Sequence, residues 1–372
     1  MKANPLRAAK RVVVKIGSSL LVDENSGHVR RKWLETLADD IAALRQKGAD
    51  VIVVTSGAIA VGRRPLGLKP GPLRLDEKQA AAAAGQIRLA HAYQEALARH
   101  NIVAAQVLLT LEDSENRNRY LNARNTLITL LAQGAVPVIN ENDTVATQEI
   151  RFGDNDRLAA RVAEMTGADV LVLFSDIDGL YTNDPRKQPD AEFLAEIREI
   201  TPKIESMAGS VGSSVGSGGM VTKLIAAKIA MGAGCKMAIG LGDALNPLSR
   251  LENGGRCTWF IPQSEPRQAR KSWIAGALSV SGTLVLDDGA VAALSKGRSL
   301  LPAGVVQVDG QFQKGDCVAF ADKKGHVLGR GLVAYGADEA KRIAGRQSGE
   351  IEAILGYRGK EELVHRDDLV VE

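Results

Sequence analysis

Short apolar runs alternate with longer amphipathic segments from residue 11 to about residue 260. The runs are rich in valine and isoleucine, which predicts strands at residues 11–16, 51–55, 103–109, 136–140, 170–175, 236–240 and 257–261. The longer segments carry apolar residues at helical spacing, which predicts helices at residues 31–47, 76–99, 118–133, 156–165 and 219–231. Strands that are apolar on both faces and separated by helices indicate an α/β fold with a mainly parallel sheet, covered by helices on both sides.

The alternation stops at residues 262–271, PQSEPRQARK, a polar stretch with two prolines that we interpret as a linker. Beyond it, Gly and Asp turns separate short predicted strands at residues 282–286, 305–308, 317–321 and 327–333. This pattern is typical of a small, mostly β domain with some helix. We therefore expect a first domain at residues 1–262, a linker at 263–280 and a second domain at 281–372, which suits a chain of 372 residues.

Composition excludes several classes of protein. With 45% hydrophobic and 24% charged residues the chain is ordinary globular material, and a net charge of +3 is too small to indicate a nucleic-acid or membrane partner. Cys235, Cys257 and Cys317 are odd in number and widely spaced, which argues against a disulfide framework or a metal cluster and fits a reducing cytoplasm. We expect no transmembrane helix and no signal peptide, because no apolar run is long enough.

Polar residues follow the first two predicted strands. Lys15 closes the first, and the turn Gly17-Ser18-Ser19 comes next. A lysine at a strand end usually extends into water, but here it also lies beside a tight turn whose backbone N–H groups can bind phosphate oxygens. The second strand runs into Ser56-Gly57, where the simpler interpretation is a serine that caps the following helix.

The fourth strand and the helix after it carry a denser group of polar side chains. They are Asn140, Glu141, Asn142 and Asp143 at the strand end, and Asp154, Asn155 and Asp156 at the predicted helix start. Carboxylates stabilise a helix N-terminus, so capping is the simpler explanation. Capping needs only one such residue, however. A cluster of carboxylates and amides suits a ligand with an ammonium group, or it holds lysines in place.

Two further segments complete the set. Ser175 and Asp176 close the fifth strand, and the turn that follows them is a candidate platform for a nucleotide base or ribose. The run 209–219, GSVGSSVGSGG, has the composition of a flexible linker, but it leads directly into a predicted helix that carries Lys223. No P-loop motif, no nucleophile elbow and no histidine spacing typical of a metal site occurs in the chain.

Together these segments identify a family. VVVKIGSSLL, VTSGAIAVG, VINENDTV, RFGDNDRLAARVA, SDIDGLYTNDP and VGSGGMVTKLIAAKIA, in this order, closely resemble the glutamate 5-kinases of the amino acid kinase superfamily. RSLLPAGV, RIAGRQSGEIEAILGY and VHRDDLV resemble the C-terminal PUA domain of that family. The resemblance implies an αβα-sandwich kinase domain that uses ATP and Mg²⁺ to phosphorylate the side-chain carboxylate of L-glutamate, the first step of proline synthesis. It also implies cytoplasmic oligomers, such as dimers or tetramers, and feedback inhibition by proline.

The resemblance also assigns roles to residues. It implies that Lys15 and Lys223 contact the phosphates and the transition state, and that Asp156 organises the two lysines. The residues implied to hold glutamate are Ser56, Asp143 and Asn155, and those implied to hold ATP are Ser175, Asp176, Ser217, Gly218 and Gly219, together with the two lysines. Many members of the family carry threonine at the position of Ser217, which is a small hydroxyl residue as well.

The residues agree with this chemistry. A glutamate side chain has a pKa of about 4.3, so the nucleophile is already an anion at pH 7 and needs no general base. The absence of a histidine near these motifs is therefore informative. The reaction does need two mutually repelling anions to be aligned, and it needs cations where negative charge develops.

Two alternatives remain open at this point. Another amino acid kinase, acting on N-acetylglutamate, aspartate, carbamate or UMP, is the nearer one, although the NEND and FGDND segments with a PUA-like tail argue against it. An RNA-binding or RNA-modifying protein that acts through the tail is the more distant one. Residues 281–372 contain 12 Lys and Arg against 14 Asp and Glu, a difference of −2, whereas an RNA-binding surface is expected to be basic.

Overall fold

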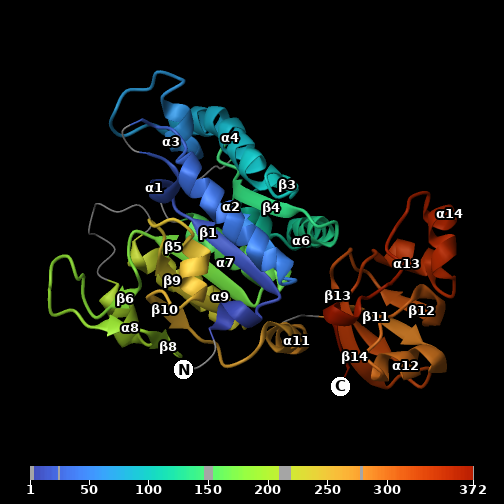
Figure 1. Ribbon diagram of the computed structural model, residues 1–372. Coiled ribbons are helices and arrows are strands. Elements are labelled where there is room, and N and C mark those ends of the chain that lie inside the picture. The colour runs from blue at the N-terminus through green and yellow to red at the C-terminus, as the bar shows by residue number, and fades with distance from the viewer. Residues whose placement is uncertain (1–3, 24–25, 146–153, 209–218, 277–279, 372) are drawn as a thin grey trace. The chain divides into compact units, whose positions relative to one another are not determined.

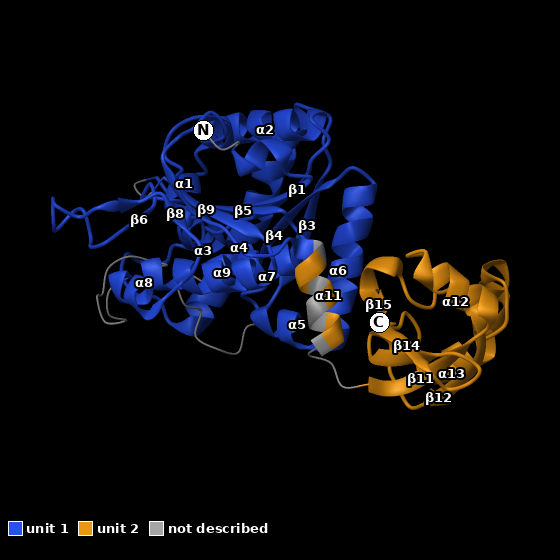
Figure 2. Ribbon diagram, turned by 90° about the horizontal axis from the view of Figure 1, so that it is seen from below, with its two compact units in different colours: residues 1–266 blue, residues 267–372 orange. Residues whose placement is uncertain are grey.

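The computed structural model describes residues 4–23, 26–145, 154–208, 219–276 and 280–371 (Figure 1). The chain forms two compact units, Met1–Pro266 and Arg267–Glu372 (Figure 2). No helix within the described ranges combines the length and the apolar character that crossing a membrane requires.

A large sheet forms the centre of the first unit. Across its described part, the strand order is β3 (Ala104–Leu109), β4 (Val136–Glu141), β2 (Asp50–Val54), β1 (Arg11–Ile16), β5 (Val170–Ser175), β9 (Lys236–Leu241), β10 (Cys257–Phe260) and β8 (Glu196–Ile197). Neighbouring strands pair in parallel, except that β10 is antiparallel to β9. The prediction of a mainly parallel sheet is confirmed. The central strands β1 and β5 are almost entirely buried, which is why their sequences are apolar on both faces.

Helices cover both faces of this sheet (Figure 1). The helices that share a core on one face are α2 (Arg31–Gln46), α3 (Ala58–Arg63), α4 (Leu75–Ala98) and α10 (Pro247–Glu252). Those that share the core on the other face are α6 (Arg117–Ala132), α7 (Asp154–Thr166) and α9 (Met220–Gly232). Smaller elements of this unit are α1 (Ser18–Leu21), α5 (Leu111–Glu115), α8 (Pro202–Met207), the 3₁₀ turn Pro5–Ala8 and the hairpin of β6 (Leu180–Tyr181) with β7 (Phe193–Leu194).

The alternation of side chains along each strand decides on which face of the sheet each polar residue lies. Val12 and Val14 pack in the core beneath α2 and α4, whereas Val13 packs in the core beneath α7 and α9. Because side chains alternate along a strand, Lys15 points to the same face as Val13. Asn140, two residues after Val138, points by the same rule to the α4 face. The sheet therefore directs the lysine and the amide to opposite layers.

Two glycines bring α3 and α4 into backbone contact. A Cβ atom added at Gly62 would lie 1.8 Å from the carbonyl oxygen of Ala81, and one added at Gly85 would lie 1.8 Å from that of Ala58. No side chain fits at such distances, so both positions require glycine. This contact fixes α4 against the helix that starts directly after β2.

The second unit contains a smaller mixed sheet. Its described strands follow the order β12 (Val305–Gly310), β11 (Val280–Leu286), β13 (Cys317–Ala321), β14 (Val327–Leu332) and β15 (Leu369–Val371). Only β11 and β13 pair in parallel among them. The other elements are α12 (Asp288–Ser295), α13 (Ala337–Ile343), α14 (Ile351–Leu355) and 3₁₀ turns at Pro302–Gly304, Ser348–Glu350 and Arg366–Asp368. A mostly β domain with some helix was expected, but β15 was not, because three residues carry too little pattern.

The stretch interpreted as a linker contains a helix, α11 (Pro266–Gly276). Pro266 is its first residue, a position where the missing N–H has no partner to lose. The proline that suggested a break in structure therefore marks a helix start. The domain limits at 262 and 281 themselves stay a prediction.

Candidate functional site

Three charged side chains converge inside the first unit. Asp156, in the first turn of α7, is fully buried, and its Oδ1 lies 2.6 Å from Nζ of Lys15 at the end of β1. Its Oδ2 lies 3.2 Å from Nζ of Lys223 in the first turn of α9. Both lysines are buried as well. The structure thus brings together two ammonium groups and one carboxylate that are far apart in the sequence.

The pKa values in this cluster reflect burial and mutual attraction. Burial by itself would raise the pKa of Asp156, but the charges of Lys15 and Lys223, with hydrogen bonds from Lys15 and Thr222, lower it below its usual range. Burial lowers the pKa of Lys223, and the attraction of Asp156 offsets only part of this effect. Asp156 therefore stays ionised, and its charge favours the protonated form of Lys223 against the effect of burial.

Thr222 is a member of the cluster that the sequence did not single out. Its Oγ1 lies 2.9 Å from Oδ2 of Asp156 and 2.9 Å from the backbone oxygen of Gly219. The one available signal was its position directly before Lys223, in the first turn of the same helix. A threonine there is more often a helix-start residue, so this signal is weak.

A second group of polar side chains lies where β2, β4 and α7 meet. Nδ2 of Asn155 donates to Oγ of Ser56 over 2.9 Å and to Oδ1 of Asn140 over 3.3 Å. Oδ1 of Asn155 is buried and accepts no hydrogen bond from any described residue. Asp143 is buried in the turn after β4. The structure therefore joins Ser56 to Asn155 and leaves one buried acceptor available.

A glycine allows the turn that carries Ser56. Gly57 precedes α3 with φ at +104°, and a Cβ atom there would come within 3.0 Å of Val22. A left-handed conformation and a close neighbour both favour glycine. This explains the Ser-Gly pair at the end of the second strand, and Gly57 rather than Ser56 is the N-cap residue of α3, so the interpretation of Ser56 as a helix cap is wrong.

Asp176 follows directly after β5, the strand that pairs with β1. Oγ of Ser175 donates to Oδ1 of Asp176 over 2.9 Å, and the Asp176 side chain is 65% exposed. Asp176 is close enough to Lys223 that its charge raises the pKa of that lysine. Ser175 and Asp176 therefore lie at the end of β5, as predicted from the sequence, and the charge of Asp176 acts on Lys223.

The glycine-rich segments differ in how much of each is described. Gly17 lies beside the first ammonium group, since a Cβ atom there would be 4.0 Å from Nζ of Lys15. Gly219 caps α9 and is exposed. Ser217 and Gly218 lie outside the described residues, as does most of the glycine-serine run.

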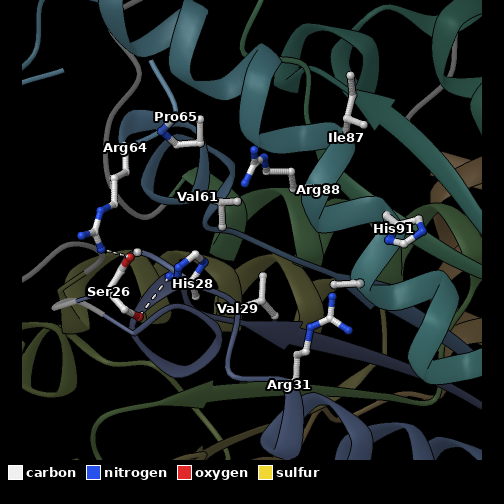
Figure 3. A pocket seen from close by; sticks show the side chains of 12 residues that line it. Ser26, His28, Val29, Arg31, Val61, Arg64, Pro65, Ile87, Arg88 and His91 are labelled. Atoms are coloured by element: carbon white, nitrogen blue, oxygen red, sulfur yellow. Dashed lines mark hydrogen bonds between the residues drawn. The ribbon is translucent and has the colours of Figure 1, made fainter. Parts of the chain in front are cut away.

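A hollow of about 900 Å³ lies elsewhere on this unit, between the chain around residue 28 and helices α3 and α4 (Figure 3). Arg31, Arg64 and Arg88 line it together with His28 and His91. None of the predicted site residues lines this hollow.

The cysteines take no part in the site. Cys235, Cys257 and Cys317 are buried and free. Burial raises the pKa of the Cys257 thiol to about 12, which keeps it protonated at neutral pH. Within the described residues, no group of three His, Cys, Asp or Glu side chains could hold a metal ion by itself.

Comparison with known proteins gives two family matches. Residues 10–240 match the amino acid kinase family, and residues 282–355 match the PUA domain. The chain is 70% identical to glutamate 5-kinase of Paramagnetospirillum magneticum over 369 residues, which cover 99% of this chain and 100% of that protein. It is 62% identical to glutamate 5-kinase of Rhodospirillum rubrum, over 97% of this chain and 96% of that one. Among solved structures, UMP kinase of Ureaplasma parvum matches 68% of this chain and 98% of its own, with a TM-score of 0.47 and 16% identity.

Proposed function

The chain belongs to the amino acid kinase family, among its glutamate 5-kinases, and we propose that it transfers the γ-phosphoryl group of ATP to the side-chain carboxylate of L-glutamate. The products are L-glutamyl 5-phosphate and ADP, and the reaction is the first step of proline synthesis. Relatives that match from end to end at 70% and 62% identity support this activity.

The observation that carries the mechanism is the buried bridge of Asp156 between two lysines. Two ammonium groups converge on one carboxylate inside the protein. Two neighbouring ammonium groups attract an anion, and this attraction is stronger inside a protein than in water. A phosphoryl group in transfer is such an anion, and it gains negative charge on its oxygens as the reaction proceeds.

The proposed step needs no general base. The γ-carboxylate oxygen of glutamate attacks the γ-phosphorus of ATP, the bond from that phosphorus to the bridging oxygen breaks, and ADP leaves. Lys15 and Lys223 contact the transferred group and stabilise the charge that develops on it. Asp156 acts through the lysines, since it fixes the position of both ammonium groups and keeps Lys223 protonated. Prearranged charges of this kind usually provide the largest single contribution to catalysis.

Glutamate binds at the group formed by Ser56, Asp143 and Asn155. The buried Oδ1 of Asn155 supports this assignment, because it is an acceptor with no donor among the described residues, and an ammonium group is a donor. The buried carboxylate of Asp143 offers a second interaction for the same ammonium group.

ATP binds on the side of the lysines where Ser175, Asp176 and Gly219 lie, and Ser217 and Gly218 belong to the same segment as Gly219. The proximity of Asp176 to Lys223 and the exposed start of α9 support this placement. A helix start with free backbone N–H groups favours phosphate oxygens.

The phosphates of the nucleotide, with an exposed carboxylate such as Asp176, would hold Mg²⁺. Mg²⁺ usually binds through one or two carboxylates plus the phosphates of its substrate, and the described residues, which offer single exposed carboxylates such as Asp176 but no cluster of three ligands, fit such binding. When bound, the ion neutralises charge between the β- and γ-phosphates.

Three further properties follow from the family resemblance. We expect a homo-oligomer, such as a dimer or tetramer, feedback inhibition by proline, and action in the cytoplasm. The three free, buried thiols are compatible with a reducing compartment.

Trapping of the product tests the proposed function. The purified protein with glutamate, Mg²⁺ and ATP, in the presence of hydroxylamine, should yield γ-glutamyl hydroxamate, and added proline should lower the yield. Aspartate, N-acetylglutamate, carbamate and UMP serve as alternative acceptors in a coupled ADP assay. Faster turnover with one of these acceptors than with glutamate would overturn the substrate assignment.

A further inference from the structure

We propose that Gln86 is a positioning residue that sets the selectivity of this site for an amino acid over a simple dicarboxylate. The inference depends on the proposed function, because it concerns how the glutamate site recognises the ammonium group. Gln86 lies on α4, one layer away from the lysines, and none of the sequence motifs includes it.

A chain of amide hydrogen bonds connects Gln86 to the substrate site. Nδ2 of Asn140 donates to Oε1 of Gln86 over 2.7 Å. Oδ1 of the same Asn140 accepts from Nδ2 of Asn155 over 3.3 Å, and this Nδ2 also donates to Ser56. The last group in the chain is Oδ1 of Asn155, which is buried and has no donor among the described residues.

The direction of the hydrogen bonds from Gln86 to Asn155 decides which ligand group the site can bind. An amide carries an acceptor on one side and donors on the other, so each amide in a chain imposes its orientation on the next. Because Gln86 presents its oxygen, Asn140 turns its nitrogen to Gln86 and its oxygen to Asn155. Asn155 then gives its nitrogen to Asn140 and Ser56, which leaves its oxygen for the ammonium group of the substrate. An oxygen attracts an ammonium group, whereas the reversed chain would present an N–H group and repel it.

The fold holds Gln86 at the start of this chain. Gly85, its direct neighbour, is in backbone contact with α3, the helix that begins after Ser56 and Gly57. Gln86 and Ser56 are therefore anchored to each other through the glycine contact as well as through the hydrogen bonds. Strand alternation on β4 turns Asn140 toward α4, where Gln86 can reach it.

The test uses Gln86→Met, which keeps the length of the side chain and removes its acceptor. KM for glutamate is expected to rise about tenfold with kcat within twofold of wild type, because the lysine cluster is untouched. The inhibition constant of glutarate, which has both carboxylates but no amino group, is expected to stay within twofold. The preference for glutamate over glutarate therefore falls by about tenfold.

Two other variants separate positioning from packing. Gln86→Glu can only accept, so it retains the direction of the chain and is expected to keep KM for glutamate within about threefold of wild type. Gln94→Met, two turns further along α4 at an exposed position, is the matched control and is expected to change nothing. Thermal unfolding of each variant shows whether the fold has survived.

The outcomes distinguish the inference from the proposed function. An inactive wild-type protein would overturn the function itself. An active wild type with an unchanged KM for glutamate in Gln86→Met would overturn the role of Gln86. Equal losses of affinity for glutamate and glutarate, or failure of Gln86→Glu to retain KM, would also overturn it, because either result indicates packing rather than recognition of the ammonium group.

Discussion

The first unit contains two groups of cationic side chains that differ in burial and in their ion-pair partners. Lys15 and Lys223 are buried and share one carboxylate. Arg31, Arg64 and Arg88 surround an open hollow and are exposed (Figure 3). Arg31 pairs with Glu95 over 3.0 Å, and Arg88 forms no ion pair or hydrogen bond to any residue in the described ranges.

The difference shows that a buried charged group depends on its partners more than an exposed one does. Two unit charges 4 Å apart interact by about 1 kcal/mol in water but by several times more where the effective dielectric constant is lower. Water therefore stabilises an exposed arginine such as Arg88 even where no described residue pairs with it, whereas the buried lysines depend on Asp156. We infer that the buried group is sensitive to each of its members and that the exposed group is not.

Asp156→Asn should have the largest effect. It removes the carboxylate that both buried ammonium groups contact, and breaking a buried ion pair typically costs about 3–5 kcal/mol of stability. We expect a loss of this size in urea unfolding and a fall in kcat of at least about a thousandfold, since two transition-state contacts are displaced together. Asp76→Asn, at an exposed position on α4, is the control. A variant with normal kcat would show that the bridge is not needed.

Lys223→Ala should lower kcat by at least about a hundredfold, because one transition-state contact is typically worth about 3–4 kcal/mol. The fold should survive, since Asp156 keeps Lys15 as a partner. Steady-state kinetics and circular dichroism measure the two effects separately. Turnover close to that of wild type would refute the role given to this lysine.

The pH dependence of kcat should show a smaller effect of the burial of Lys223. Burial lowers the pKa of Lys223 below its ordinary value of 10.5, and the protonated form is the active one. The wild-type kcat should therefore fall as the pH rises through a value below 10.5. Lys223→Arg keeps its charge to above about pH 12, so its residual kcat should lack this decline. The same alkaline midpoint in both proteins would assign the titration to another group.

Arg88→Ala should have the smallest effect. The side chain is exposed, and surface substitutions usually change stability by no more than about 0.5 kcal/mol. We expect kcat and KM for glutamate to stay within twofold of wild type. A change of tenfold in either constant would show that the exposed arginines serve the reaction and would break the contrast between the two groups.

Helices and strands could be predicted where their apolar residues follow a clear pattern along the sequence. Strands β1, β5 and β13 end at the predicted residues, because buried strands are apolar throughout and are bounded by turns. Helix α4 was displaced by a single residue at each end. The failures have a physical reason as well. A strand of three residues such as β15 has no measurable period, and a proline can begin a helix as well as interrupt one, as in α11.

The sequence by itself determined the order of the segments, the parallel sheet and the polar residues at the strand ends, because apolar period and turn residues are local properties. Motifs that match a family also singled out Lys15, Asp156 and Lys223. The family resemblance also implied that Asp156 organises both lysines. Only the tertiary structure decided that Thr222 completes this group. It also decided that Gln86 directs the amides. The physical reason is that hydrogen-bond partners depend on which helix covers which face of the sheet, and the partners here come from segments as far as 99 residues apart.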